Sequence, residues 1–228
     1  MPLLSVIIPV YNEAKTVKQL IEKVHAVNIE KEIIVVDNCS TDGTQKILSE
    51  LRYDNLKIIY HSSNRGKGAS CITGLNNAIG EYVIIQDADL EYDPNDYLVL
   101  FDAIKDGSAD MVLGARFFKG YKGLFMHVAG NKFLTFMVNF LFCANISDYA
   151  TCYKLTRRDI FNSFKLKTIG FDSEVEIICK ALINKIRIKE VHISYFPRSY
   201  HEGKKIRVTD AFWAVLAMFK FRLFGRCL

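Results

Sequence analysis

The stretch Tyr82-Val83-Ile84-Ile85-Gln86-Asp87-Ala88-Asp89-Leu90-Glu91 is a short apolar run followed at once by carboxylates. Such a run is typical of a buried strand in a parallel sheet, so Asp87 and Asp89 would emerge together at its carboxyl end. Mg²⁺ prefers oxygen ligands and commonly takes one or two carboxylates together with substrate phosphates. The stretch therefore indicates either a cation site for a phosphate-bearing ligand or a solvated acidic turn, since Asp is also common after strands.

The composition is that of a globular protein with an uneven charge distribution. Of 228 residues, 50% are hydrophobic and 24% are charged, which suits one α/β domain and excludes wholesale disorder. The net charge is +5, and the basic residues outnumber the acidic ones from Arg198 onward. This bias favours an anionic partner, either phosphate or an acidic membrane surface. Nucleic acid is not expected as a partner, because the basic residues cluster late and no recognition module appears.

The cysteines and the N-terminus indicate a reducing compartment. Six cysteines lie far apart without C-x-x-C spacing, so neither a zinc site nor a disulfide framework is expected. The first apolar stretch has the length of a strand, and it lacks a basic region and a cleavage site. We therefore expect a cytoplasmic protein.

The first half of the chain alternates strand and helix patterns, which predicts a mostly parallel sheet with helices on both faces. Val17, Leu20, Ile21 and Val24, for example, fall at the spacing of one helix face, and Asn12 is a candidate cap before them. Strands are expected at residues 3–9, 32–37, 56–61, 82–87 and 110–116.

Two further helix boundaries can be predicted from capping residues. A helix over residues 67–79 is expected to end at Gly80, which would serve as its C′ glycine. Asp93 and Pro94 form a suitable cap and first-turn pair for the next helix.

Polar residues follow each of the five expected strands. Ligands of such sheets bind outside the carboxyl ends of the strands, so these polar loops are expected to line one site. Turn chemistry alone does not account for five successive polar loops on one edge. The loops lie at residues 9–13, 37–44, 64–68, 87–89 and 114–116.

Taken together, these loops resemble family 2 glycosyltransferases of the GT-A fold over roughly the first 116 residues. The matching elements are Pro9-x-Tyr11-Asn12-Glu13, residues 35–44, Asn64-x-Gly66-Lys67-Gly68 and Asp87-x-Asp89. Residues 148–154, 170–174 and 197–206 are similar to polyprenyl-phosphate sugar transferases such as dolichyl-phosphate mannose synthases. Two departures stand out: the family's Asp-Asp is Asp37-Asn38 here, and an arginine expected near Met126 and His127 has no clear counterpart.

The resemblance implies a metal-dependent, inverting transfer of a hexose from GDP-mannose or UDP-glucose to a dolichyl or undecaprenyl phosphate. It implies Mg²⁺ or Mn²⁺ as the cofactor. One GT-A domain would span residues 1–228: residues 1–116 would bind the nucleotide sugar, residues 117–207 the acceptor, and residues 208–228 would form an amphipathic helix. The protein would lie on the cytosolic face of a membrane, and the sequence does not identify protein partners.

The candidate site residues fall into four groups. Those expected to bind the nucleotide sugar are Pro9, Tyr11, Glu13, Asp37, Asn38, Asn64, Lys67, Asp87, Ala88 and Asp89. Those expected to hold the cation are Asp87, Asp89 and Glu91. Those expected to bind phosphate or the acceptor are Arg116, Arg198, Lys204 and Lys205. The residues expected to act in catalysis are Asp89, Asp172 and Arg116.

Several of these residues also have an ordinary structural interpretation. Asp37 could cap a turn, and Glu13 and Asp172 could favour a helix N-terminus by their charge. Lys67 and the late basic residues could simply be solvated. A phosphate acceptor is already anionic near neutral pH, since its second pKa is about 6, and so needs no base. A sugar hydroxyl acceptor would instead require a carboxylate base such as Asp172.

Two apolar segments bear on the acceptor. Residues 133–146 carry no charge, and residues 211–219 precede Lys220 and Arg222. Both are shorter than the roughly 20 residues that cross a bilayer as a helix. Apolar aromatics beside cations fit a helix in the membrane interface, and packing against the catalytic domain or a partner subunit is the alternative.

Other functional classes remain open at this point. The nearest is a family 2 transferase that acts on a soluble or cell-surface glycan hydroxyl. A noncatalytic binding subunit is disfavoured by the intact Asp87/Asp89 pair. A nicotinamide-dependent oxidoreductase is disfavoured because residues 9–13 stand where its glycine fingerprint would be.

Overall fold

The computed structural model of the chain describes residues 1–117, 125–170, 172–198 and 208–225. Strands and helices alternate along the first half, and helices predominate in the second. The strands are β1 (Leu4–Val10), β2 (Lys31–Asp37), β3 (Leu56–Tyr60), β4 (Tyr82–Ile85), β5 (Met111–Ala115), β6 (Lys154–Arg157) and β7 (Ile188–His192). The helices are α1 (Val17–Ala26), α2 (Thr44–Glu50), α3 (Lys67–Asn77), the 3₁₀ turn η1 (Pro94–Asp96), α4 (Tyr97–Ile104), α5 (Phe125–Phe142), α6 (Arg158–Ser163), α7 (Ser173–Ile183) and α8 (Val208–Phe224).

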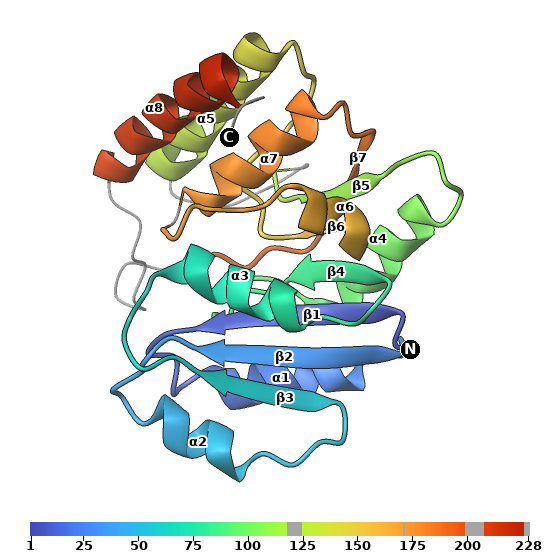
Figure 1. Cartoon of the computed structure of the whole chain (residues 1–228), viewed down its shortest axis with the longest axis vertical. Helices are drawn as coiled ribbons and strands as arrows, with labels where there is room; N and C mark the ends of the chain where they lie inside the picture. The colour runs from blue at the N-terminus through green and yellow to red at the C-terminus, as the bar shows by residue number, and fades with distance from the viewer. Residues whose placement is uncertain (118–124, 171, 199–207, 226–228) are drawn as a thin grey trace.

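The seven strands form one mostly parallel sheet in the order β3-β2-β1-β4-β6-β5-β7. Strands β3, β2, β1 and β4 run parallel, so their carboxyl ends lie at one edge of the sheet, on the left in Figure 1. Strand β6 is antiparallel to both β4 and β5, and β7 is parallel to β5. All five strands predicted from the sequence are present, within one or two residues at each end.

The core lies between the sheet and the helices on its two faces. The apolar runs of β1 and β2 are fully buried because α3 covers one face and α1 the other (Figure 1). The predicted inward face of α1, Val17 to Val24, is completely buried. The predicted mostly parallel α/β sheet flanked by helices is therefore confirmed.

Two of the predicted helix boundaries are wrong. Asn12 does not cap α1, which begins after Thr16; its backbone is left-handed, with φ of 55°, and its side chain bonds to another loop. Gly80 is not the C′ residue of α3, which ends at Asn77. A side chain at residue 80 would collide with the backbone nitrogen of Ser5, at 2.6 Å, so close packing explains this glycine. Asp93 does act as a cap, by accepting a bond from the Asn95 N–H.

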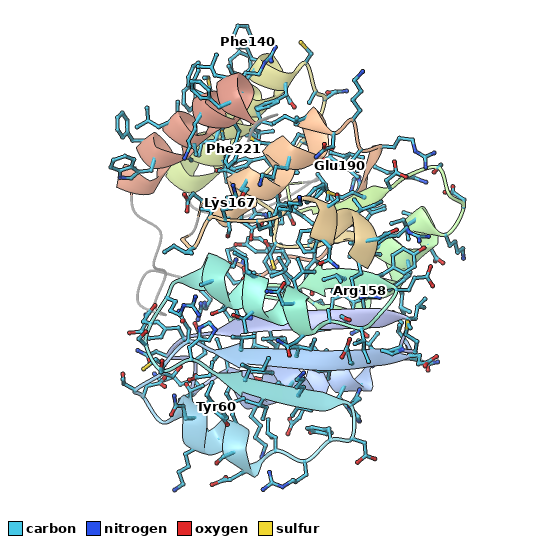
Figure 2. The ribbon with its side chains drawn as sticks, in the orientation of Figure 1. Tyr60, Phe140, Arg158, Lys167, Glu190 and Phe221 are labelled. Carbon is cyan, nitrogen blue, oxygen red and sulfur yellow. The ribbon has the colours of Figure 1, made fainter. Side chains whose placement is uncertain are left out.

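Helices α5, α7 and α8 pack together beside the β6-β5-β7 half of the sheet (Figure 1). The inner sides of α5 and α8 are buried through Val138 and Met218, at 0% exposure. Figure 2 shows Phe221 between α8 and α7, whereas Phe140 lies at the outer edge and is 70% exposed. Both apolar segments therefore pack against the domain on one side and present aromatic rings on the other.

Among the residues that the structure describes, no helix has both the length and the apolar character needed to cross a membrane.

Candidate functional site

The loops after β1 and β2 are tied together by hydrogen bonds, which fixes one wall of the carboxyl edge. The Asn12 side-chain oxygen accepts from the Thr41 N–H at 2.8 Å, and the Asn12 N–H donates to Ser40 Oγ at 2.9 Å. The Glu13 N–H donates to Thr44 Oγ1 at 3.0 Å. The Glu13 carboxylate accepts a hydrogen bond from the Thr16 hydroxyl at 2.9 Å, at the start of α1, and also contacts Arg198 in the segment that follows β7.

Gln86 anchors the turn that carries the two aspartates. It is fully buried, and its side-chain oxygen accepts hydrogen bonds from the hydroxyls of Tyr97 and Tyr153, each at 2.6 Å. Its amide donates to the Asp87 carbonyl at 2.9 Å. Strand β4 ends at Ile85, so Asp87 and Asp89 follow it directly at the carboxyl edge, with side chains 25% and 18% exposed.

Arg198 joins three acidic side chains from two other loops. Its guanidinium lies 3.1 Å from Asp89 Oδ2 and 3.2 Å from Glu13 Oε2. Its backbone N–H donates to Glu91 Oε1 at 2.9 Å. The structure thus brings together residues that the sequence had assigned to different roles. Glu13 was expected to bind the donor, Asp89 and Glu91 the cation, and Arg198 phosphate or the acceptor.

Glu91 is held by the segment that follows β7. Besides the Arg198 N–H, its carboxylate accepts a short hydrogen bond from the Tyr195 hydroxyl, and its side chain is only 9% exposed. The Glu91 carbonyl also accepts from the Phe196 N–H at 2.8 Å. Glu91 therefore fastens residues 195–198 to the acidic turn, and its role as a cation ligand stays a prediction.

The turn after β4, which we call the acidic turn, carries the carboxylates Asp87, Asp89 and Glu91. Burial raises the pKa of Asp89 to about 7, the carboxylates of Asp87 and Glu91 add to this rise, and Arg198 opposes it. Within the described ranges, no three acidic, His or Cys side chains converge closely enough to hold a metal ion by themselves. Two half-buried carboxylates, Asp87 and Asp89, fit a cation that takes its remaining ligands from substrate phosphates.

Lys67 begins α3 and faces the same turn. Its ammonium lies 2.7 Å from Asp87 Oδ1 and 3.1 Å from Glu174 Oε1 on α7. Burial would lower the pKa of Lys67, but the carboxylates of Asp87 and Glu174 raise it well above its usual value. Lys67 is therefore a bound, charged residue rather than the solvated lysine that the sequence left open.

Asp37 ends β2 and is fully buried. Its Oδ2 accepts from the Ser40 N–H at 3.1 Å and from the Gln45 amide at 2.7 Å. Its Oδ1 is buried and has no hydrogen-bond partner among the described residues. Asp37 thus caps the following turn with one oxygen and keeps the other as an unused acceptor.

Asn38 joins the loops after β2 and β3. Its amide donates to Asn64 Oδ1 at 2.9 Å, and its oxygen accepts from the Arg65 N–H at 2.9 Å and faces His61 Nδ1 at 3.0 Å. An aspartate here would lack the donor and would set two acceptors against each other. The departure from the family's Asp-Asp pattern therefore has a structural reason.

Arg116 is held by Asp148 and lies against Tyr195, whose hydroxyl donates to Glu91. Its guanidinium donates two hydrogen bonds to Asp148, at 2.7 and 2.8 Å, and lies 5.1 Å from the centre of the Tyr195 ring. Asp148 is fully buried and also accepts from Asn131 at 3.1 Å. Burial alone would raise the pKa of Asp148, but its bonds with Arg116 hold it below the usual value.

Asp172 occupies the N-cap position of α7, but its side chain makes no capping hydrogen bond. It lines a hollow of about 300 Å³ together with Lys220 and Phe221 of α8. Among the described residues, none of the acidic side chains of the β4 turn lines this hollow. The catalytic role of Asp172 stays a prediction.

The remaining candidates are placed more simply. Pro9 and Tyr11 are half-buried at the end of β1 and just after it, and Ala88 is buried between the two aspartates. Lys204 and Lys205 lie outside the described residues.

Sequence reasoning missed residues that shape the site from behind. Gln86 and Asp148 are fully buried, and Lys154 is 1% exposed. All three lie in stretches that the sequence singles out, residues 82–91 and 148–154, but none was given a role there, because each acts through a partner far along the chain: Tyr153 for Gln86, Arg116 for Asp148 and Glu174 for Lys154. Polar residues next to apolar strands are a weak general hint of such networks.

The family of the chain follows from comparison with known proteins. Residues 5–164 match the model of Glycosyl transferase family 2. The fold and the acidic edge agree with this match, and the chain belongs to glycosyl transferase family 2. The resemblance deduced from the sequence is confirmed.

Two curated relatives are similar to most of this chain. The chain is 30% identical over 205 residues to the low-salt glycan biosynthesis hexosyltransferase Agl6 of Haloferax volcanii, covering 86% of this chain and 48% of the relative. It is 29% identical over 212 residues to the dolichol-phosphate mannosyltransferase of Pyrococcus furiosus, covering 88% of this chain and 58% of that one. The chain therefore spans about half the length of these relatives.

A solved structure supports the GT-A fold. The glucosyl-3-phosphoglycerate synthase of Mycobacterium tuberculosis, in complex with Mn²⁺, UDP and phosphoglyceric acid, superposes with a TM-score of 0.73 at 17% identity. The match covers 99% of this chain and 78% of the other. At this identity the likeness concerns the fold.

Proposed function

We propose that the chain is a metal-dependent, inverting glycosyltransferase that moves a hexose from GDP-mannose or UDP-glucose to a polyprenyl phosphate. The observation that carries this proposal is the meeting of Glu13, Asp89 and Arg198, from three separate loops, at the carboxyl edge of the sheet. Open α/β sheets bind their ligands at this edge. Family 2 membership and the likeness to a dolichol-phosphate mannosyltransferase support the donor and acceptor classes.

Residues 1–116 would bind the donor. The unused oxygen of Asp37 would accept a hydrogen bond from the nucleoside, since a buried acceptor without a partner costs free energy until it is paired. Asn38 and Asn64 hold the two neighbouring loops at a fixed separation. Pro9 and Tyr11 would line the same edge, so the nucleoside would lie across the ends of β1 and β2.

Asp87 and Asp89 would hold the cation together with the donor diphosphate. Mg²⁺ or Mn²⁺ bound there supplies positive charge that stabilises the departing nucleoside diphosphate. The solved structure with Mn²⁺ and UDP supports this assignment. Arg198 lies close enough to Asp89 to turn its guanidinium from the carboxylates to phosphate oxygens, which it can bind with two hydrogen bonds.

Residues 117–207 would bind the acceptor. A phosphate acceptor is anionic at neutral pH, so orientation by cationic side chains matters more than proton removal. Arg198, Arg116, Lys204 and Lys205 are the candidates for this role. Direct attack on the anomeric carbon in a single displacement would invert its configuration. Asp172 would act as a base only if the acceptor were a sugar hydroxyl.

The outer face of α5 and α8 would lie on the cytosolic surface of a membrane. Aromatic side chains gather there, with Phe136 stacked on Phe140 and Phe212 packed against Trp213. Their exposure ranges from 60% to 70%. Exposed aromatic rings beside basic residues are typical of helices in a membrane interface, and residues 208–228 would form part of this surface.

A transfer assay tests the proposed reaction. The purified chain is incubated with GDP-[¹⁴C]mannose or UDP-[¹⁴C]glucose, undecaprenyl or dolichyl phosphate, and Mn²⁺ or Mg²⁺. We expect label in the organic phase with one donor, lost on adding EDTA and in Asp89→Asn. Label that enters only water-soluble glycans would favour the hydroxyl acceptor. No transfer with any acceptor would favour a binding subunit.

Liposome flotation tests the membrane contact. We expect the wild-type chain to float with vesicles that contain anionic lipid, and Phe136→Ser/Phe140→Ser to remain largely in the soluble fraction. Leu98→Ser/Val99→Ser is the matched control, since these side chains on α4 are also exposed, at 46% and 45%. If the wild-type chain remains soluble, the membrane contact is refuted.

A further inference from the structure

A row of alternating charges runs from the interior of the domain to Asp87. Lys154 of β6 lies 2.5 Å from Glu174 Oε2, Glu174 Oε1 lies 3.1 Å from Lys67, and Lys67 lies 2.7 Å from Asp87 Oδ1. The four residues come from β6, α7, α3 and the turn after β4. We call Lys154, Glu174 and Lys67 the charge relay.

Exposure increases along the row toward the edge of the sheet. The side chains of Lys154, Glu174, Lys67 and Asp87 are 1%, 12%, 17% and 25% exposed. Lys154 is held in place at the buried end, because its ammonium also donates a short hydrogen bond to the Thr151 carbonyl. The row therefore has a fixed end inside the protein and an open end at the candidate cation site.

Within the relay, neighbouring charges favour the ionised forms of Glu174 and Lys67. Burial would raise the pKa of Glu174, but the ammonium groups of Lys154 and Lys67 hold it below its usual value. Lys67, between two carboxylates, is likewise held as a cation. Because an ammonium has three donors and both carboxylates occupy Lys67, its position is determined by Asp87 and Glu174 together.

Stability alone does not explain such a row. Buried ion pairs are often no more stabilising than apolar residues of similar volume. A row of this kind does, however, fix the orientation of the group at its exposed end. Residues that hold the ligands of a metal typically change metal affinity when they are replaced, although they never touch the metal.

We propose that Lys154 and Glu174 are positioning residues for the cation site: they hold Lys67, and Lys67 orients the Asp87 carboxylate toward a shared divalent cation. This inference rests on the proposed function, which supplies the cation. It gives Lys67 a role different from the nucleotide-sugar contact that the sequence predicted. It also predicts that a lysine of β6 that does not contact Asp87 influences the binding of metal.

The same helix α7 provides a matched control. Glu176 forms a second buried pair with Lys180 at 2.8 Å, with side chains 1% and 5% exposed. Lys180 also donates to the Phe164 carbonyl at 2.7 Å, much as Lys154 donates to Thr151. The Glu176–Lys180 pair has no ion pair to Asp87 or Lys67 among the described residues. Lys154→Met and Lys180→Met therefore remove equivalent buried charges, and only the first belongs to the relay.

Mn²⁺ binding in the absence of nucleotide tests the inference directly. Free Mn²⁺ is measured by electron paramagnetic resonance at increasing protein concentration, with the thermal midpoint of each variant recorded alongside. We expect Lys154→Met and Glu174→Gln to weaken Mn²⁺ binding by about tenfold. Lys180→Met should lose comparable thermal stability but bind Mn²⁺ as the wild type does. A double-mutant comparison adds a second readout: in a Lys67→Met background, Glu174→Gln should have no further effect on Mn²⁺ affinity.

The outcomes separate this inference from the proposed function. If Mn²⁺ binding is lost in Asp89→Asn but unchanged in Glu174→Gln and Lys154→Met, the relay is overturned and the cation site stands. If Lys154→Met does not fold, the Mn²⁺ affinities of Glu174→Gln and of the double mutant test the relay instead. Wild-type affinity in Glu174→Gln would then overturn it. If the wild type does not bind Mn²⁺, or binds it independently of Asp89, both the cation site and the relay are overturned.

Discussion

The guanidinium of Arg198 lies 3.1 Å from the carboxylate of Asp89, which we propose as a cation ligand at the sheet edge. Arg198 reaches it from the segment after β7, more than a hundred residues away in sequence. The same guanidinium contacts Glu13, so one positive charge bridges two acidic loops. A divalent cation and Arg198 would therefore compete for the same oxygen atoms.

Replacing Arg198 is expected to strengthen the binding of metal in the absence of nucleotide. Arg198→Gln removes a competing charge from a partly exposed pair, an interaction worth up to about 1 kcal/mol, so Mn²⁺ affinity should rise by up to roughly fivefold. The free Mn²⁺ signal in paramagnetic resonance measures this. The control is Arg187→Gln, which breaks an exposed ion pair with Asp110 at the amino ends of β5 and β7. It should leave the Mn²⁺ affinity unchanged. Equal or weaker binding by Arg198→Gln would contradict the competition.

Replacing Asp89 is expected to remove activity without unfolding the protein. Asp89→Asn takes away charge that would hold the cation against the leaving diphosphate, so turnover should fall by about 10²- to 10³-fold. The side chain lies at the edge of the sheet, beside two other carboxylates, so its neutralisation also relieves like-charge repulsion. Turnover of the labelled donor and the thermal midpoint are the two measurements. Wild-type turnover in Asp89→Asn would exclude a catalytic role for this carboxylate.

The parallel half of the fold could be predicted because its strands are buried on both faces. That environment requires continuous apolar runs such as residues 33–36, and these stand out in a sequence. The polar loops after them follow from the same geometry, since parallel strands place their carboxyl ends at one edge. Asp87 and Asp89 were therefore placed correctly without knowledge of any contact.

Strand β6 could not be predicted for the opposite reason. It is four residues long, reads Lys-Leu-Thr-Arg, and inserts antiparallel between β4 and β5. Lys154 looks like a surface residue, and its burial becomes possible only because Glu174 neutralises it from α7. The pairing of Arg116 with Asp148 has the same origin, so the sequence pattern assigned Arg116 to phosphate while the folded chain gives it a buried partner. Such non-local pairs leave no periodic signal.

Replacing Asp148 is expected to destabilise the fold strongly. Asp148→Asn leaves the guanidinium of Arg116 buried without a counter-charge, and breaking such a pair from one side typically costs about 3–5 kcal/mol. Urea unfolding followed by circular dichroism measures the change. Asp102→Asn is the matched control, since Asp102 pairs with Lys105 at 2.6 Å on the surface and both side chains are about 70% exposed. A loss below about 1 kcal/mol in Asp148→Asn, the level of an exposed pair, would show that the buried pair contributes little.

The difference in the free energy of unfolding between the wild type and Asp148→Asn, which we call the stability gap, is expected to shrink in acid. The pKa of Asp148 in the folded protein lies below its ordinary value of 3.8, because Arg116 and the bonds it donates outweigh the effect of burial. A carboxylate of this kind stabilises the fold above its unfolded-state pKa, and that contribution disappears as the pH falls through the lower folded-state pKa. The variant has no titrating group at residue 148, so the difference between the two proteins isolates this group from all other carboxylates.

Urea midpoints at roughly pH 6 and pH 3 are the measurement, with Asp102→Asn again as the control that should show a small difference from the wild type at both pH values. A gap between wild type and Asp148→Asn that is equally large at both pH values would mean that the folded protein keeps Asp148 ionised well below pH 3, or that the loss in the variant comes from packing rather than charge.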